Sequence, residues 1–214
     1  GFLECLLMHS IGWKMPSLVC RLKALASGCR PMNLCGKCWS RMAALAPYHD
    51  AMDEIGRAAH ALYRTYNPAH LVEHSSRAQA TVIYDHAVAE ADRRLLDDRN
   101  VLSKEIRRLQ VWIFKDQDIV LRFKKMDQDG LSQNYRTRQQ KDYDRGEELP
   151  GLPYPPERLT FGYLLDATGT NYVRTQIAQP KGASVLWCAA LVPLEQRDAV
   201  GASWQDVTRQ RAAI

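Results

Sequence analysis

Apolar side chains recur at helical spacing after residue 50, where acidic residues suit the positive N-terminal end of a helix. One stripe consists of Met52, Ile55, Ala59, Leu62 and Tyr66. Asn67 and Pro68 end this helix, and they are typical of the cap and first turn of a new one. The next stripe consists of Val82 or Ile83, Ala87, Ala91 and Leu95. The pattern therefore predicts a layer of two or three helices.

The period of the pattern changes to two after Asn100, which indicates strands. LQVWIF at 109–114 and IVLRFKK at 119–125 flank a polar turn and predict a β-hairpin. Three more apolar runs predict a meander: LTFGYLL at 159–165, NYVRTQIA at 171–178 and SVLWCAALV at 184–192. Short turns favour antiparallel neighbours. The predicted fold class is α+β, with two or three N-terminal helices packed on an antiparallel sheet of about five strands.

A long connection, residues 127–157, separates the two groups of strands. Its polar first half is compatible with a short helix, and its Pro-rich second half, LPGLPYPP, predicts an extended strap. Connections of this length within a compact domain are more often functional or mobile than accidental. We therefore expect function in this connection.

The chain divides into three predicted segments. Residues 1–41 form a cysteine-rich basic leader, 42–194 a single α+β domain, and 195–214 a loosely held, weakly helical tail. The leader lacks a clean amphipathic period and ends where Met42-Ala43 would suit a translation start. We interpret it as a misassigned start or an extension, and a genuine flexible or metal-binding arm is the alternative.

The net charge of +5 lies entirely in the leader, which holds six basic residues against one acidic residue. The rest holds 23 of each sign, so overall charge gives no case for nucleic-acid binding. No run of 18 uncharged apolar residues is present, and the N-terminus lacks the charged start of a secretory signal. Only Cys188 lies outside the leader, and we expect it to be a small buried hydrophobe. These features predict a cytoplasmic protein without a membrane segment.

The sequence HLVEH at 70–74 has the order of inverted zinc peptidases. On one helix, His70 and His74 would share a face and bind Zn²⁺, with Glu73 as general base. Glu147 or Glu148 would supply the third ligand. Solvated or packed histidines are the alternative, and they are the interpretation we prefer; the preferred prediction therefore has no cofactor and no catalytic residue.

Two further polar groups offer chemistry. Asp85 and His86 form one of these groups, because an imidazole can act as acid, base or ligand. Arg77 lies two turns earlier, and His60 and His74 could lie near it in the fold. No nucleophile or phosphate-binding loop accompanies them. We predict structural hydrogen bonds there. A single CxxC, Cys35 to Cys38, lacks the second pair that a zinc site needs.

Basic and aromatic side chains alternate from the hairpin into the long connection. They are Arg122, Lys124, Lys125, Tyr135, Arg136, Arg138 and Lys141. Strand alternation puts Arg122 and Lys124 on a face opposite Phe123, and an open face there would hold phosphates while Trp112 or Phe114 stacked on bases. Asp127, Asp129, Asp142 and Asp144 dilute this positive field, so a protein partner is slightly favoured over nucleic acid. The alternative interpretation is structural, because lysines on a solvent-exposed strand edge prevent that edge from pairing with other chains.

Three runs carry a resemblance: RFKKMDQDGLSQNYRTRQQ, ELPGLP and LTFGYLLDATGT. Together they make roughly residues 66–192 similar to uncharacterised bacterial proteins that mobile elements encode beside genes for regulator-linked metallopeptidases. The resemblance implies a cytoplasmic, antitoxin-like accessory protein that acts through a partner. We therefore expect a non-catalytic regulatory protein that binds a protein or nucleic acid through the hairpin face and residues 127–157, with a zinc-dependent hydrolase as the alternative.

Overall fold

The computed structural model describes residues 36–106, 108–133, 137–149 and 156–209. The chain divides into two compact units, Gly1–Leu34 and Cys35–Ile214, and every described residue belongs to the second. Residues 1–35 of the predicted leader therefore lie outside the description. Among the residues described, no helix is both long enough and apolar enough to cross a membrane.

Six α-helices lie within the described ranges. They are α2 (Gly36–Ala44), α3 (His49–Arg64), α4 (Pro68–Glu73), α5 (Ser76–Leu95), α6 (Arg138–Arg145) and α7 (Arg197–Val200). Asn67 caps α4 as predicted, because its side chain accepts a hydrogen bond from the Ala69 amide at 3.0 Å. Ser75 caps α5 in the same way through the amide of Ala78. The two predicted helical stripes thus become α3 and α5.

Seven strands in the described part form one sheet in the order β1 to β7. They are β1 (Val101–Ile106), β2 (Leu109–Phe114), β3 (Ile119–Lys125), β4 (Glu157–Leu165), β5 (Tyr172–Lys181), β6 (Ser184–Leu191) and β7 (Trp204–Asp206). The α+β class is confirmed, and the predicted hairpin and meander are β2–β3 and β4–β6. The expected number of about five strands is too small.

The two additional strands lie at the edges of the sheet. In β1 only the two end residues are buried, so its sequence, VLSKEI, lacks the alternation that marks a half-buried strand. The strand β7 has three residues, and it forms by pairing with β6. Both β1 and β7 are strands because they pair with β2 and β6, and their own hydrophobic patterns do not predict strands.

The sheet is not wholly antiparallel, because β3 and β4 run parallel from Ile119 beside Glu157 to Lys125 beside Tyr163. The long connection between these strands contains α6, so β3, α6 and β4 form the crossover that parallel neighbours need. Gly162 permits this pairing, since an added Cβ would lie 1.7 Å from the carbonyl oxygen of Lys124. The connection is therefore a structural crossover in its described part.

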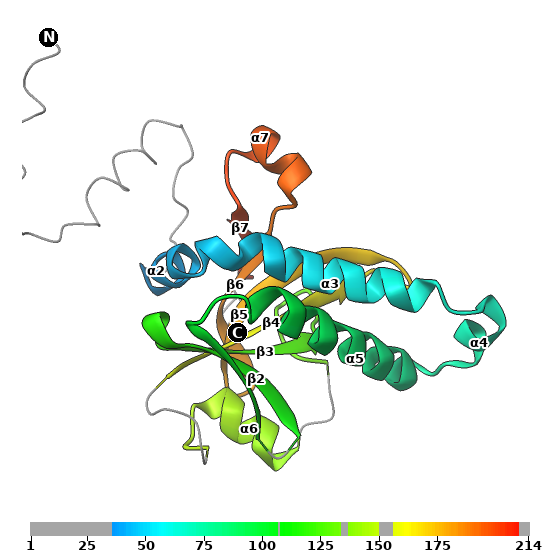
Figure 1. Cartoon of the computed structure of the whole chain (residues 1–214), viewed down its shortest axis with the longest axis horizontal. Coiled ribbons are helices and arrows are strands. Elements are labelled where there is room, and N and C mark those ends of the chain that lie inside the picture. The colour runs from blue at the N-terminus through cyan, green and yellow to red at the C-terminus, as the bar shows by residue number, and fades with distance from the viewer. Residues whose placement is uncertain (1–35, 107, 134–136, 150–155, 210–214) are drawn as a thin grey trace, which may run out of the picture. The chain divides into compact units, whose positions relative to one another are not determined.

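The main hydrophobic core lies between the sheet and the helices α3 and α5, which cover one face (Figure 1). Met52, Ile55 and Ala59 are fully buried there, as the stripe predicts. Leu62 and Tyr66 are 40% and 38% exposed, whereas Tyr63 is buried. The buried stripe continues from Ala59 to Tyr63 because four residues complete the turn of a 3.6-residue helix.

The opposite face of the sheet is covered by α6 and by the turn at residues 126–132 (Figure 1). Tyr143 of α6 packs with Val111 and Val120 in a second apolar cluster. Gly130 lies against the third cluster, where an added Cβ would be 2.8 Å from the sulfur of Cys188. Both faces of the central strands are therefore buried.

The described ends of the second unit pack on its core. The predicted boundary at Met42 falls inside α2, in which Cys38 and Met42 are both fully buried. In the predicted tail, β7 pairs with β6, and the ring of Trp204 meets that of Trp39 edge to face at 5.1 Å. The described tail residues thus contact both the sheet and α2.

Candidate interaction surfaces

Arg122, the first cation of the predicted hairpin face, lies inside the protein with 1% of its surface exposed. Its Nε donates to Thr160 Oγ1 at 3.0 Å, and its Nη2 forms an ion pair with Asp144 of α6. The guanidinium also lies 4.2 Å from the ring centre of Tyr143. Arg122 therefore joins β3 and β4 to α6.

The two lysines that follow on β3 are also partly enclosed. The Nζ of Lys124 lies 4.9 Å from the ring centre of Tyr84, because β2 pairs with β3 only as far as Leu121 and α5 approaches beyond it. Burial, and secondarily the charge of Arg122, lowers the pKa of Lys124 to about 8. Burial also lowers the pKa of Lys125. The expectation that this face is open to solvent is wrong.

The aromatic rings expected beside these cations are buried as well. Trp112 and Phe114 belong to the main core and have no exposed surface. The hydroxyl of Tyr143 lies within hydrogen-bonding distance of the backbone oxygens of Val120 and Leu159, at 2.9 and 2.7 Å, and donates its one hydrogen between them. These rings therefore have no face free to stack on a base.

Two cations of the predicted set remain on the surface. Arg138 and Lys141 are exposed on α6. Tyr135 and Arg136 lie outside the described residues. The surface part of the predicted set is therefore the outer side of α6.

The HLVEH motif does not form the expected helical pair of ligands. The helix α4 ends at Glu73, and His74 is extended with ψ at 122°. His70 and Glu73 are mostly exposed, and His74 Nδ1 lies 3.2 Å from the hydroxyl of Tyr63. Within the described ranges, no three His, Cys, Asp or Glu side chains lie where they would hold a metal ion, and these ranges include Glu147 and Glu148.

Two further histidines of the described residues, His60 and His86, make hydrogen bonds within the fold. His60 Nε2 lies 3.0 Å from the carbonyl oxygen of Thr170, and His86 Nε2 lies 3.0 Å from the hydroxyl of Tyr66. Cys188 is fully buried, and this burial raises the pKa of its thiol to about 12. In the CxxC motif, Cys38 belongs to the main core, whereas Cys35 lies outside the description.

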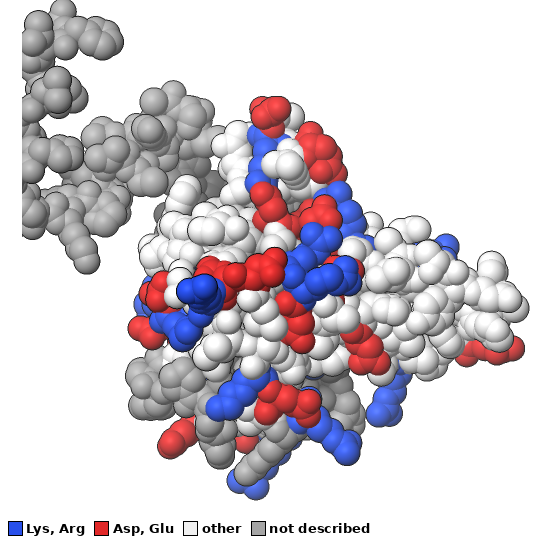
Figure 2. Space-filling view, viewed as in Figure 1, with Lys and Arg blue, Asp and Glu red and all other residues white. Residues whose placement is uncertain are grey.

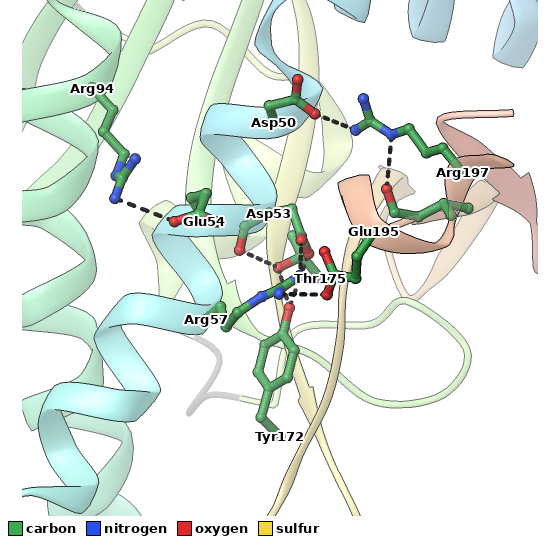
Figure 3. Close-up of polar contacts among 10 residues, drawn as sticks. Asp50, Asp53, Glu54, Arg57, Arg94, Tyr172, Thr175, Glu195 and Arg197 are labelled. Carbon is green, nitrogen blue, oxygen red and sulfur yellow. Dashed lines mark hydrogen bonds and ion pairs between the residues drawn. The ribbon is translucent and has the colours of Figure 1, made fainter.

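A polar network that the sequence did not predict surrounds Asp53 of α3, which is 4% exposed (Figure 3). Tyr172 of β5 donates to the Asp53 carboxylate at 3.1 Å, and Arg57 forms an ion pair with the same group. Arg57 also pairs with Glu195 at 2.9 Å. The acidic residues after residue 50 had only suggested a helix N-terminus; Arg57 is a neighbour of Asp53 on α3, but Tyr172 comes from β5, which the sequence does not place beside α3.

The outer edge of this network is a shallow groove of mixed charge. Arg94 of α5 reaches Glu54 of α3 at 3.4 Å, and Arg197 of α7 pairs with Asp50 (Figure 3). The groove is lined by Asp50, Ala51, Glu54, Arg93, Arg94 and Asp97. Its charges are of both signs, and the ion pairs Arg94–Glu54 and Arg197–Asp50 join α3 to α5 and α7.

The segment from the end of α3 to the start of α5, residues 62–75, makes a surface with few charges that we name the α4 tip. Val72 is 88% exposed, and Leu62 and Tyr66 of the same segment are partly exposed. Only Arg64 and Glu73 carry full charges in this segment. Figure 2 shows the tip as a broad white end, whereas the first half of the helical layer carries a band of both charges.

No family model, curated protein or solved structure matches this chain. The fold and the surfaces therefore define a class of architecture, an α+β protein with a seven-stranded mixed sheet, in the described residues. The resemblance to proteins of bacterial mobile elements stays a prediction.

Proposed function

We propose that this chain is a non-catalytic regulatory protein, of the antitoxin-like accessory kind, which acts by binding another protein through the α4 tip. The observation that carries the proposal is the exposure of Val72 on α4, which lies at one end of the helical layer (Figure 1). Exposed apolar surface in a segment with few charges is a feature of contacts with partners.

The α4 tip has features that suit a protein interface. Leu62, Tyr66 and Val72 offer apolar and aromatic surface, and charged residues are depleted at the centres of such interfaces. Tyr66 is held by His86 and Tyr63 by His74, so both rings are positioned before a partner arrives. Such order reduces the entropy lost on binding.

The hairpin face that the sequence suggested does not support this function, because α6 covers Arg122 and Val120. The zinc-hydrolase alternative has no geometric support, since α4 ends before His74. The binding surface is therefore proposed on the helical layer.

Affinity capture from a bacterial lysate, followed by mass spectrometry, tests the proposal when wild type is compared with Val72→Glu. The new carboxylate would lie in the apolar contact, where an unpaired buried charge is costly. We expect the substitution to lower the yield of the captured partner at least tenfold. Because Val72 is exposed, the thermal unfolding midpoint should be unchanged.

The matched control is Leu194→Glu, which places the same charge on a residue that is 69% exposed in another part of the described surface. We expect this variant to capture the partner as wild type does. Equal capture by wild type, Val72→Glu and Leu194→Glu, or capture of nothing by wild type, would contradict the proposal.

A further inference from the structure

The charges of α6 are sorted between its two sides. Asp144 faces inward and pairs with Arg122, which is 1% exposed. Asp142 is half-buried beside Arg158, whose Nη1 donates to the Asp142 carbonyl oxygen at 3.0 Å. The buried Arg122 therefore neutralises Asp144, whereas Arg158 contacts the backbone of Asp142 and leaves its half-buried carboxylate beside the cations.

The outer side of α6 keeps its positive charges. Arg138, Lys141 and Arg145 are all exposed, and their spacing of three and four residues puts them on one stripe about 10 Å long. Arg145 pairs with Glu147 at 3.4 Å, but both side chains are more than half exposed, so the pair holds Arg145 weakly.

A fourth exposed cation, Arg108, lies in the turn that the N-terminal end of α6 contacts. Gln139 donates to the carbonyl oxygen of Ile106, which brings α6 against the turn between β1 and β2. Arg108 is exposed in that turn. We name Arg108, Arg138, Lys141 and Arg145 together the α6 cationic stripe.

The composition of the stripe indicates which kind of partner it would bind, a polyanion or another protein. Of the large hydrophobic side chains exposed in the described residues, none lies between Leu102 and Val173. Protein interfaces have an apolar centre, whereas contacts with phosphates need only cations that displace counterions. The stripe has cations without that apolar centre, which is the reverse of the α4 tip.

We propose that the α6 cationic stripe binds the phosphate backbone of a nucleic acid, without reading its bases. Trp112, Phe114 and Tyr143 are buried, so base stacking by these rings does not contribute. Binding through about four phosphate contacts is independent of sequence and falls steeply with salt. This surface is separate from the α4 tip and does not depend on the function proposed there.

Fluorescence anisotropy with the full chain and a labelled 20-base-pair DNA duplex of random sequence tests this proposal over a series of salt concentrations. The test variant is Arg138→Gln with Lys141→Gln, and the matched control is Arg64→Gln with Arg77→Gln. Both remove two exposed cations, and the cations of residues 1–41 are the same in both. Circular dichroism melting checks that both fold.

We expect the test variant to bind the duplex at least tenfold more weakly than wild type at low salt. Its slope of log affinity against log salt should be smaller by about two, because two phosphate contacts are lost. The control should match wild type. Replacing Glu147 and Glu148 by Gln should strengthen binding, because it removes the acidic groups beside Arg145.

Three results would overturn the proposal. They are no binding by wild type at low salt, an equal loss in the test and control variants, and a preference for a poly-glutamate peptide over the duplex. The third result would assign the stripe to an acidic protein.

Discussion

His49, the first residue of α3, is 1% exposed, and its Nδ1 lies 2.9 Å from the hydroxyl of Ser203. Burial, and secondarily the charge of Arg197, lowers the pKa of His49 from 6.5 to about 4. The folded state therefore holds this ring neutral, although Asp50 nearby favours the charged form. Below about pH 6.5 the unfolded chain carries a proton on His49, and His49 must release that proton when the chain folds.

The free energy of unfolding should consequently depend on pH through His49. Its contribution is fully present above pH 6.5 and is lost as the pH falls toward 4, because the unfolded state binds more protons in that window. Between pH 7 and pH 5 we expect His49 to account for a loss of about 2 kcal/mol. Urea unfolding of wild type and His49→Gln at both pH values measures this difference.

The comparison needs a histidine that is not enclosed in this way. His86, which is half-buried on α5, provides the control as His86→Gln. This variant should keep the wild-type loss of stability between pH 7 and pH 5. If His49→Gln loses as much stability on acidification as His86→Gln, His49 is not the group responsible.

At the scale of elements, the contact between α6 and the sheet depends on Arg122. This side chain joins Thr160 of β4, Ser132 of the 126–132 turn and Asp144 of α6. All three partners come from the connection or from the strand that follows it. A single residue of β3 thus orders the crossover that makes β4 a parallel neighbour.

Arg122→Ala should lower the free energy of unfolding by about 3–5 kcal/mol, which is typical of breaking a buried ion pair. Chemical denaturation of the variant measures the loss. Arg138→Ala is the control, because Arg138 is exposed on the same helix and its loss should change stability by less than about 0.5 kcal/mol. Similar small losses in both variants would show that Arg122 does not hold α6 in place.

At the scale of the whole described unit, the C-terminal segment that follows the meander packs on the sheet and on α3. The strand β7 pairs with β6, and Val207 donates to the carbonyl oxygen of Cys188 at 2.9 Å. The same segment supplies Ser203 to His49 and Glu195 to Arg57. These contacts reach both the edge of the sheet at β6 and the helix α3.

A chain that ends at Val192 should therefore unfold at a lower temperature than the full chain. We expect a loss of about 2 kcal/mol or more, since an edge strand, an aromatic pair and buried hydrogen bonds are removed together. Differential scanning calorimetry measures the midpoint. A chain that ends at Arg209 is the control and should melt as the full chain does; equal midpoints for the two truncations would support the loosely held tail that the sequence suggested.

The sequence by itself determined the elements whose burial is periodic. Met52, Ile55 and Ala59 repeat at helical spacing because α3 is buried on one side only, and Ile119, Leu121 and Phe123 alternate because they face one core. The predicted cap at Asn67 acts through the amide of Ala69, two residues away. Local periodicity and local hydrogen bonds can be read without the fold.

The tertiary structure alone decided what covers the second face of the sheet. Strand alternation correctly separates Arg122 from Phe123, but it does not say whether water or α6 lies over Arg122. The same contact turns Asp144 inward and leaves Arg138 and Lys141 outside. Charge on a surface depends on which side chains pair within the fold, and those pairs join residues that are far apart in the sequence.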